Sequence, residues 1–491
     1  MDPIVLIHGY SAESKQITPA AIHKTYGTLP DALRDVYGGN SIVEINLSRY
    51  ISLEDGLTID DISRAFDRAL KAEFAHLLQG KFHVIIHSTG ALVVRNWLRL
   101  FSPKPSPITN LIYLAGANFG SGWGHIGKGQ LAKWGRLVFE GGAERGLQIL
   151  DALELGSDRT LDMHLHFLKA GNAMVADYGV REAVISGTQA DVSWFSAPIR
   201  YAKEDGSDGV VRVSGSNVNF HYVRFGPTAE AAEIPWKEIT SQTDRNLARE
   251  GKRKQYYQVQ EKNHPGSVER PQVPMGIPFR CAHTGDDMGV VVGSRPRAQV
   301  MRMIRAALEA TADTWPGLVS LFQEETKKTY QRAIDEEGPA WWKKWLDDPR
   351  AQYDHHAQVI FRLRDQHGAP VSHYDIFFES TQRTVKARPI QTLFEDKHVN
   401  EKSSNVLVFY LRTDAFVNKT VGWKSRLGEV DIGALEITAV EPQTGEILYL
   451  PFRLELEANQ LGEWLQGHHT TIFDVELLRL PSPNVFRMIR L

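Results

Sequence analysis

The sequence predicts an α/β protein with a mostly parallel β-sheet, followed by a separate all-β, sandwich-like domain. Over roughly the first 310 residues, short apolar runs alternate with amphipathic helical patterns, which is typical of parallel sheets. From residue 358 onward, strand patterns separated by turn signals replace this alternation. The third observation concerns Ser88: the apolar run that ends just before it is followed directly by a helical pattern.

The first 312 residues supply the elements of the parallel sheet. Apolar runs predict strands at 4–7, 41–47, 83–86, 108–114, 183–187 and 279–282. Apolar residues recurring at three- and four-residue spacing predict helices at 28–36, 59–78, 91–101 and 296–310.

Two insertions interrupt this domain. Residues 118–178 begin rich in glycine and then carry two amphipathic stretches, around 131–139 and 147–155, which predict a helical cap or lid over an apolar cleft. Residues 226–274 are polar, with Lys-Arg-Lys at 252–254 and several prolines, and we expect a long surface excursion there.

The remaining chain forms a helical linker at 313–355 and the all-β domain at 356–491. The linker ends in Trp341, Trp342 and Trp345, which we expect to fill a joint between domains rather than to seat in a membrane interface. The all-β domain has predicted strands at 359–363, 374–379, 406–412, 434–440, 447–456 and 471–478.

The composition excludes several classes of protein. The chain of 491 residues has 42% hydrophobic and 23% charged residues and a formal net charge of −3, so nucleic acid is not the expected partner. A single cysteine, Cys281, rules out an intrachain disulfide and a cysteine-rich metal cluster. With no signal-peptide pattern and no apolar run near the roughly 20 residues that span a bilayer, we expect a cytoplasmic protein or one exported without a signal peptide.

The turn at Ser88 is the candidate for covalent chemistry. A strand–serine–helix turn holds a hydroxyl clear of the backbone, beside the N-terminus of a helix that favours developing negative charge. Serine is a weak nucleophile until a histidine accepts its proton, and an acidic side chain orients that histidine. We therefore expect Ser88 to be a nucleophile with an acid and a base downstream.

Two aspartates compete for the role of the acid. Asp208 lies in Asp205-Gly-Ser-Asp208 and is followed by glycine and β-branched residues, which suits a loop at a strand edge; Asp205 is the close alternative. His283 is the expected base, because it follows a predicted strand and precedes the last helix of the domain. His221 and His264 are weaker candidates.

Developing oxyanion charge needs two backbone N–H donors near the nucleophile. Thr89 follows Ser88 and would provide one donor. Tyr10, in the turn after the first strand, would provide the other, with Gly9 permitting the turn and His8 in a structural role.

Several segments in the right order resemble bacterial lipases of the α/β-hydrolase fold. They are Val5-Leu-Ile-His-Gly-Tyr10, His87-Ser-Thr-Gly90, Leu114-Ala-Gly-Ala-Asn-Phe-Gly-Ser121, Asp208-Gly-Val-Val and His283. The resemblance covers about residues 1–310 and implies a triad of Ser88, Asp208 and His283, with Tyr10 and Thr89 as the oxyanion hole. One departure is Ile86, which stands where the usual Gly-x-Ser-x-Gly pattern has glycine.

We expect a lipase that hydrolyses lipid esters and contacts a lipid surface transiently, without a cofactor or metal. Some lipases bind calcium near the histidine loop, but Asp286 and Asp287 fit solvated loop residues better than calcium ligands. Alternatives within the class are a phospholipase, including a secreted antibacterial effector, a short-chain esterase or an acyltransferase. In a different class, the chain is a non-catalytic scaffold that binds ligands or partners through its β domain.

Overall fold

The chain forms two compact units in the computed structural model. The first comprises residues 1–219, 265–355 and 416–423, and the second comprises 220–264, 356–415 and 424–491. The structure describes residues 2–8, 25–51, 56–121, 147–189, 204–232, 255–283, 290, 297–336, 348–379, 388–441, 447–456 and 460–481.

The first unit contains a six-stranded sheet in the order β2-β1-β3-β4-β5-β8, with parallel pairing throughout. Every residue of β3 and β4 is buried, as expected for strands that are covered on both faces of a parallel sheet. The strands are β1 (Ile4–His8), β2 (Ile42–Asn46), β3 (Phe82–His87), β4 (Ile108–Leu114), β5 (Arg181–Ile185) and β8 (Met275–Gly276).

Five predicted strands are confirmed to within two residues at each end, and the sixth is wrong. The last strand, β8, lies at Met275–Gly276 rather than at 279–282. Beyond β8 the backbone bonds to side chains instead of to a neighbouring strand: Ile277 N–H donates to Thr326 Oγ1, and Phe279 N–H donates to the Gln299 side chain. Arg280 then turns the chain with a φ of 50°.

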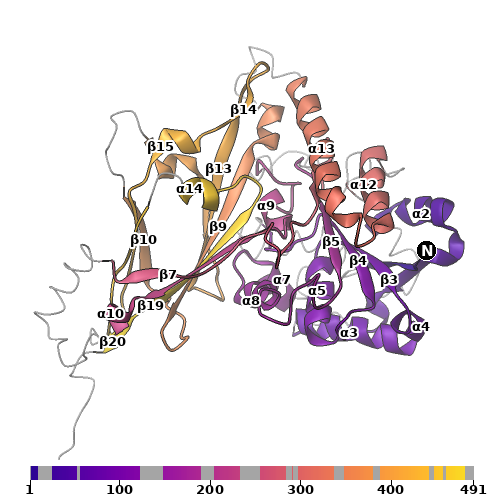
Figure 1. The fold of residues 1–491 in the computed structure, drawn as a ribbon, viewed down its shortest axis with the longest axis horizontal. Helices are drawn as coiled ribbons and strands as arrows, with labels where there is room; N and C mark the ends of the chain where they lie inside the picture. Colours follow the sequence, from indigo (N-terminus) through magenta and orange to yellow (C-terminus); the bar gives the residue numbers. More distant parts are fainter. Residues whose placement is uncertain are drawn as a thin grey trace, which may run out of the picture. The chain divides into compact units, whose positions relative to one another are not determined.

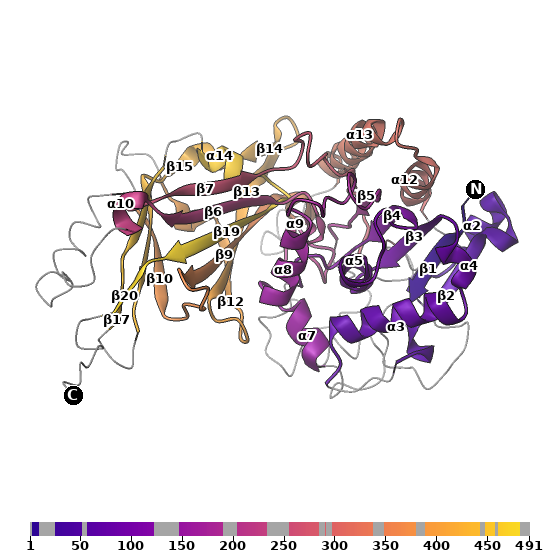
Figure 2. The ribbon, with the colours of Figure 1, turned by 60° about the horizontal axis from the view of Figure 1, so that its bottom comes forward.

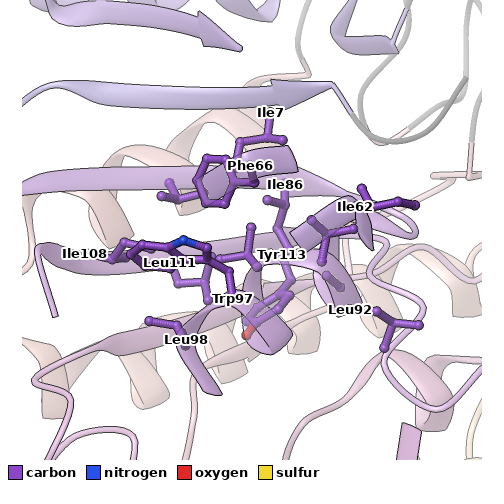
Figure 3. Close-up of a cluster of buried hydrophobic side chains, with 14 of the residues drawn as sticks. Ile7, Ile62, Phe66, Ile86, Leu92, Trp97, Leu98, Ile108, Leu111 and Tyr113 are labelled. Carbon is purple, nitrogen blue, oxygen red and sulfur yellow. The ribbon is translucent and has the colours of Figure 1, made fainter. Parts of the chain in front are cut away.

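Helices cover both faces of this sheet (Figure 1). One face packs against α3 and α5, where Phe66 and Trp97 meet side chains of the central strands, and Figure 3 shows this cluster. The other face packs against α2, α12 and α13. The predicted helix at 59–78 breaks after Ala72 into two. The helices are α2 (Leu29–Tyr37), α3 (Ile59–Ala72), α4 (Ala75–Leu78), α5 (Gly90–Leu100), α12 (Ala298–Glu309) and α13 (Trp315–Ile334).

Shorter helices complete the first unit. In the cap region, α7 (Leu147–Leu153) and α8 (Asp158–His166) are helical, whereas the amphipathic stretch predicted at 131–139 lies outside the described residues. The single-turn helix α9 (Val213–Ser216) follows the predicted acid. None of the helices in the described part of the chain is long and apolar enough to cross a bilayer.

The second unit is built from two sheets that share one apolar core. A mixed sheet has the order β12-β13-β9-β19-β6-β7, with β14 pairing with β13, and a three-stranded antiparallel sheet has the order β10-β16-β18. Phe361 of the first sheet and Phe452 of the second belong to the same buried cluster. The sheet strands are β6 (His221–Pro227), β7 (Tyr257–Asn263), β9 (His355–Asp365), β10 (Tyr374–Glu379), β12 (Phe394–Val399), β13 (Val406–Asn418), β14 (Gly422–Ser425), β16 (Ala434–Ala439), β18 (Phe452–Glu455) and β19 (Thr470–Leu477).

Short elements complete the second unit. The predicted strand at 447–456 is two strands, β17 and β18, with Pro451 between them. Two further pairs form outside the main sheets, β11 with β15 and β17 with β20. The remaining elements are α10 (Ala229–Ala232), α14 (Gln460–Trp464), β11 (Arg388–Pro389), β15 (Val430–Asp431), β17 (Ile447–Tyr449) and β20 (Arg479–Pro481).

The segment expected as a surface excursion at 226–274 differs most from expectation. Its described part includes β7, which pairs antiparallel with β6, and β6 in turn pairs parallel with β19 (Figure 2). The stretch therefore contributes β7 and the end of β6 to the mixed sheet of the second unit. Most of β7 is exposed because it is an edge strand, so its polar sequence lacks the apolar run by which strands are recognised.

Candidate active site

Ser88 occupies a sharp turn between the end of β3 and the start of α5. Its φ of 52° lies in the left-handed region that few non-glycine residues adopt, and the side chain is almost fully buried. Two backbone hydrogen bonds hold this conformation: Ser88 N–H donates to Leu114 O at 3.2 Å, and Ala117 N–H donates to Ser88 O at 3.2 Å. These two bonds connect the turn to the last residue of β4 and to the segment that follows β4.

Ile86 fits beneath this turn despite its departure from the usual pattern. It is fully buried in the core between the sheet and α5 (Figure 3). A Cβ atom placed on Gly90 would lie 3.4 Å from the Ile86 Cβ, at the near limit of ordinary contact. Ile86 therefore packs against the first residue of α5 at ordinary contact distance, without crowding the backbone of the turn.

His283 lies between Ser88 and Asp208. Its Nε2 is 3.0 Å from Ser88 Oγ, and its Nδ1 is 3.0 Å from Asp208 Oδ2. The His283 side chain is 1% exposed and that of Asp208 is not exposed at all, so solvent competes little for these hydrogen bonds. The two residues are also linked through the backbone, because His283 N–H donates to Asp208 O at 2.9 Å.

The loop after Asp208 orients its carboxylate. Oδ1 accepts hydrogen bonds from the backbone N–H groups of Val210 and Val211, at 3.0 and 2.7 Å, which leaves Oδ2 to face the histidine. Of the two predicted aspartates, Asp208 forms the hydrogen bond to His283. Gly187 packs closely against both segments, since a Cβ atom there would lie 3.3 Å from the Asp208 Cβ and 2.0 Å from Cys281 O, two residues before His283.

His87 contacts the base in a way that the sequence analysis did not anticipate. Its Nε2 donates to the backbone oxygen of His283 at 3.2 Å, and the two imidazole rings are 4.7 Å apart between centroids. The only sequence signal is its position next to Ser88, because the acceptor lies 196 residues away in the chain.

A buried ion pair lies between α5 and the neighbouring strands. Arg95 donates to Glu182 and to Tyr113 Oη, and both charged side chains are less than a tenth exposed. Burial and the Glu182 carboxylate raise the Tyr113 pKa well above its ordinary value, so the phenol stays protonated. Burial and the Arg95 charge lower the pKa of His164 in α8, whose ring stacks on Phe119. Arg95 of α5 is therefore bonded to β4 and β5, and His164 of α8 packs on Phe119 in the segment after β4.

The structure describes the other predicted site residues only in part. Thr89 is buried directly after Ser88, and its hydroxyl has no hydrogen-bond partner among the described residues. Tyr10, Asp286, Asp287 and the three linker tryptophans lie outside the described residues. His221 and His264 belong to the second unit. Among the described residues, no three histidine, cysteine or acidic side chains converge as metal ligands would.

Comparison with solved structures finds a bacterial enzyme that is similar over its full length. Phospholipase PlaB from Legionella pneumophila matches 100% of this chain and 96% of its own, with 24% sequence identity and a TM-score of 0.74, as does its complex with thio-NAD. The mature lipase BlEst2 from Bacillus licheniformis matches 44% of this chain and 79% of its own, at 13% identity and a TM-score of 0.30. No family model matches the sequence, and no curated protein matches it.

The similarity over the full length shows the fold of the chain. It has an α/β-hydrolase fold with a mostly parallel sheet, joined to a second β-rich region of mixed and antiparallel strands.

Proposed function

We propose that this chain is a serine carboxylic-ester hydrolase that acts on lipid esters through an acyl-serine intermediate. The observation that carries the proposal is the hydrogen-bonded series from Ser88 Oγ through His283 to Asp208, built on a serine with positive φ at the start of a helix. Two 3.0 Å contacts to opposite nitrogens of one imidazole are the arrangement that activates a serine hydroxyl.

In the proposed reaction, His283 Nε2 takes the proton of Ser88 as Oγ forms a bond to the ester carbonyl carbon. The tetrahedral oxyanion accepts hydrogen bonds from the N–H groups of Thr89 and Tyr10. His283 then gives its proton to the departing alcohol oxygen as that carbon–oxygen bond breaks. Water attacks the carbonyl carbon of the acyl-serine while His283 Nε2 takes a proton from it. His283 then gives that proton to Ser88 Oγ as the ester bond breaks, which releases the carboxylic acid and restores the free serine.

Asp208 fixes the orientation of the base throughout this cycle. Its Oδ2 accepts a hydrogen bond from the Nδ1–H group of His283, so Nε2 is left to accept the proton of serine. When His283 becomes an imidazolium, the carboxylate also stabilises the positive charge. The backbone bonds from Val210 and Val211 hold Oδ1, so Asp208 needs no rearrangement during the reaction.

A phospholipid is the favoured substrate within this class. The observation behind this choice is the similarity to a phospholipase over 100% of the chain, including the second unit. Fold similarity also accommodates triglyceride or short-chain ester hydrolysis. Hydrolysis rates on phospholipid, triglyceride and p-nitrophenyl esters of increasing chain length distinguish these substrates, and faster turnover of triglyceride than of phospholipid would contradict the choice.

Labelling with a fluorophosphonate tests whether Ser88 is the nucleophile. We expect the wild-type protein to be labelled, Ser88→Ala to lose labelling, and the control Ser63→Ala to keep it, because Ser63 is a fully buried serine that bonds to helix carbonyls. Labelling that persists in Ser88→Ala excludes Ser88. A wild-type protein that stays unlabelled favours the non-catalytic scaffold.

A further inference from the structure

The hairpin of β13 and β14 ends in an exposed turn, here called the 417–421 tip. Its residues run Val417-Asn-Lys-Thr-Val421, and every one of them is exposed. The Asn418 side chain accepts hydrogen bonds from the N–H groups of Thr420 and Val421, both at 2.9 Å, and Gly422 completes the turn with a φ of 70°. The tip is therefore held in one conformation by its own side chain.

The base of the hairpin is anchored within the first unit. Asp354 Oδ1 accepts hydrogen bonds from Phe416 N–H at 2.8 Å and from Trp423 Nε1 at 2.9 Å, one on each side of the tip. The Phe416 and Trp423 rings meet edge to face at 5.1 Å, and the Arg350 guanidinium lies 4.3 Å from the Phe416 ring. An aromatic base that is bonded on both strands makes the tip a rigid projection.

The chemistry of the tip differs from that of an ordinary surface turn. Turns favour glycine, asparagine, aspartate and serine, whereas this one is flanked by valines that are 51% and 54% exposed. Lys419 lies between them and Lys424 follows, and the chain contains no acidic residue between Asp414 and Glu429. Exposed aliphatic side chains beside two lysines suit the boundary between anionic headgroups and acyl chains.

We propose that the 417–421 tip docks this protein on the surface of an anionic lipid bilayer. Val417 and Val421 enter the level of the headgroups, while Lys419 and Lys424 pair with lipid phosphates. The inference rests on the proposed function, since a hydrolase of lipid esters has to reach substrate that is packed in a membrane. The charge of the tip selects anionic lipid as the partner, because a neutral bilayer offers the lysines no net attraction.

Sedimentation with vesicles tests the docking surface without relying on hydrolysis. The probe is the full chain carrying Ser88→Ala, mixed with vesicles of ether-linked phosphatidylcholine with or without ether-linked phosphatidylglycerol. We expect binding to the anionic vesicles that weakens as salt is added. Val417→Ser with Val421→Ser should lower the partition coefficient about tenfold, and Lys419→Gln about fivefold.

Matched controls are available on the same unit. Val268 is 99% exposed in a turn, and Lys169 is an exposed lysine after α8. Val268→Ser and Lys169→Gln should bind vesicles like the parent, and thermal unfolding of each variant reports whether it is folded.

The proposal is overturned if the parent does not bind, if the tip variants bind like the parent, or if the controls lose as much affinity. It is equally overturned if the valine variants change only the oligomeric state in sedimentation velocity, since the tip would then contact protein.

The result stays separate from the test of the catalytic proposal. A protein that binds the ether-lipid vesicles but resists fluorophosphonate labelling would keep the docking surface and lose the proposed function. A protein that is labelled by the fluorophosphonate but does not bind the vesicles would keep the proposed function and lose the docking surface.

Discussion

His87 donates a hydrogen bond to the backbone oxygen of His283. The residue before the candidate nucleophile is therefore bonded to the main chain of the candidate base. We expect His87→Phe to keep much of the ring packing but to lose the donor, and to lower kcat about 10- to 100-fold with little change in KM. His87→Gln, which retains an N–H donor, should recover part of that loss. Equal kcat values for the phenylalanine variant and the wild type would show that the hydrogen bond is not needed for positioning.

Asp208→Asn should slow the reaction far more than it destabilises the fold. The amide oxygen can still accept from Val210 and Val211, but its NH₂ group would face Nδ1 of His283 and favour the wrong tautomer. We expect kcat to fall about 10³- to 10⁴-fold. Asp205→Asn is the matched control and should retain most of the activity, and a larger loss at position 205 would reverse the assignment of the acid.

Ile86→Ala tests whether the bulky residue before the turn contributes to stability or obstructs the turn. The side chain is fully buried, so its truncation should lower the free energy of unfolding by about 2–4 kcal/mol. Fluorophosphonate labelling should persist below the unfolding transition, because Ser88 keeps its bonds to Leu114 and Ala117. Urea unfolding supplies the first measurement. A variant more stable than the wild type would mean that Ile86 strains the turn.

Gly187→Ala should disturb the acid and base together. An added Cβ atom would lie 2.0 Å from Cys281 O and 3.3 Å from the Asp208 Cβ, so one of these segments has to move. We expect a loss of activity of at least about 100-fold, because displacements near 1 Å cost that much in positioned sites. Gly80→Ala is the control, since no atom lies within 4 Å of its added Cβ. Wild-type activity in Gly187→Ala would show that the loops adjust freely.

His83 should make the protein less stable in mild acid. Burial lowers its pKa to about 4; a nearby Asp2 opposes this and Arg181 adds to it. The folded state therefore prefers the neutral ring, and protonation favours the unfolded chain, whose ordinary value is near 6.5. This contribution is complete above about pH 6.5 and is lost as the pH falls toward 4, amounting to about 2 kcal/mol by pH 5. Urea unfolding at several pH values should show a shallower pH dependence for His83→Gln, and identical slopes would contradict the prediction.

Five of the six strands of the parallel sheet, and the helices that cover it, were predictable because apolar runs and apolar periodicity are local features of the sequence. The order of Ser88, Asp208 and His283 also identified three side chains that the structure brings within hydrogen-bond distance. The pairing of β6 with β19 was not predictable, because no local pattern records a partner that lies far along the chain. Strand β8 escaped prediction for a different reason, since two residues are too short for any period.

Between Asp208 and His283 the chain passes through the second unit, so assembly of the candidate site depends on strands that are synthesised later. After Asp208 the chain enters the second unit as β6, returns from it after β7, and only then reaches His283. Inside that sheet β6 lies between β7 and β19, and the ribosome makes β19 only after more than 460 residues. In a nascent or truncated chain that lacks β19, one edge of β6 therefore has no strand to pair with. Strand β6 belongs to the segment that connects the candidate acid, Asp208, to the candidate base, His283. We expect premature termination anywhere before β19 to yield inactive protein, even when every residue of the parallel sheet has been translated.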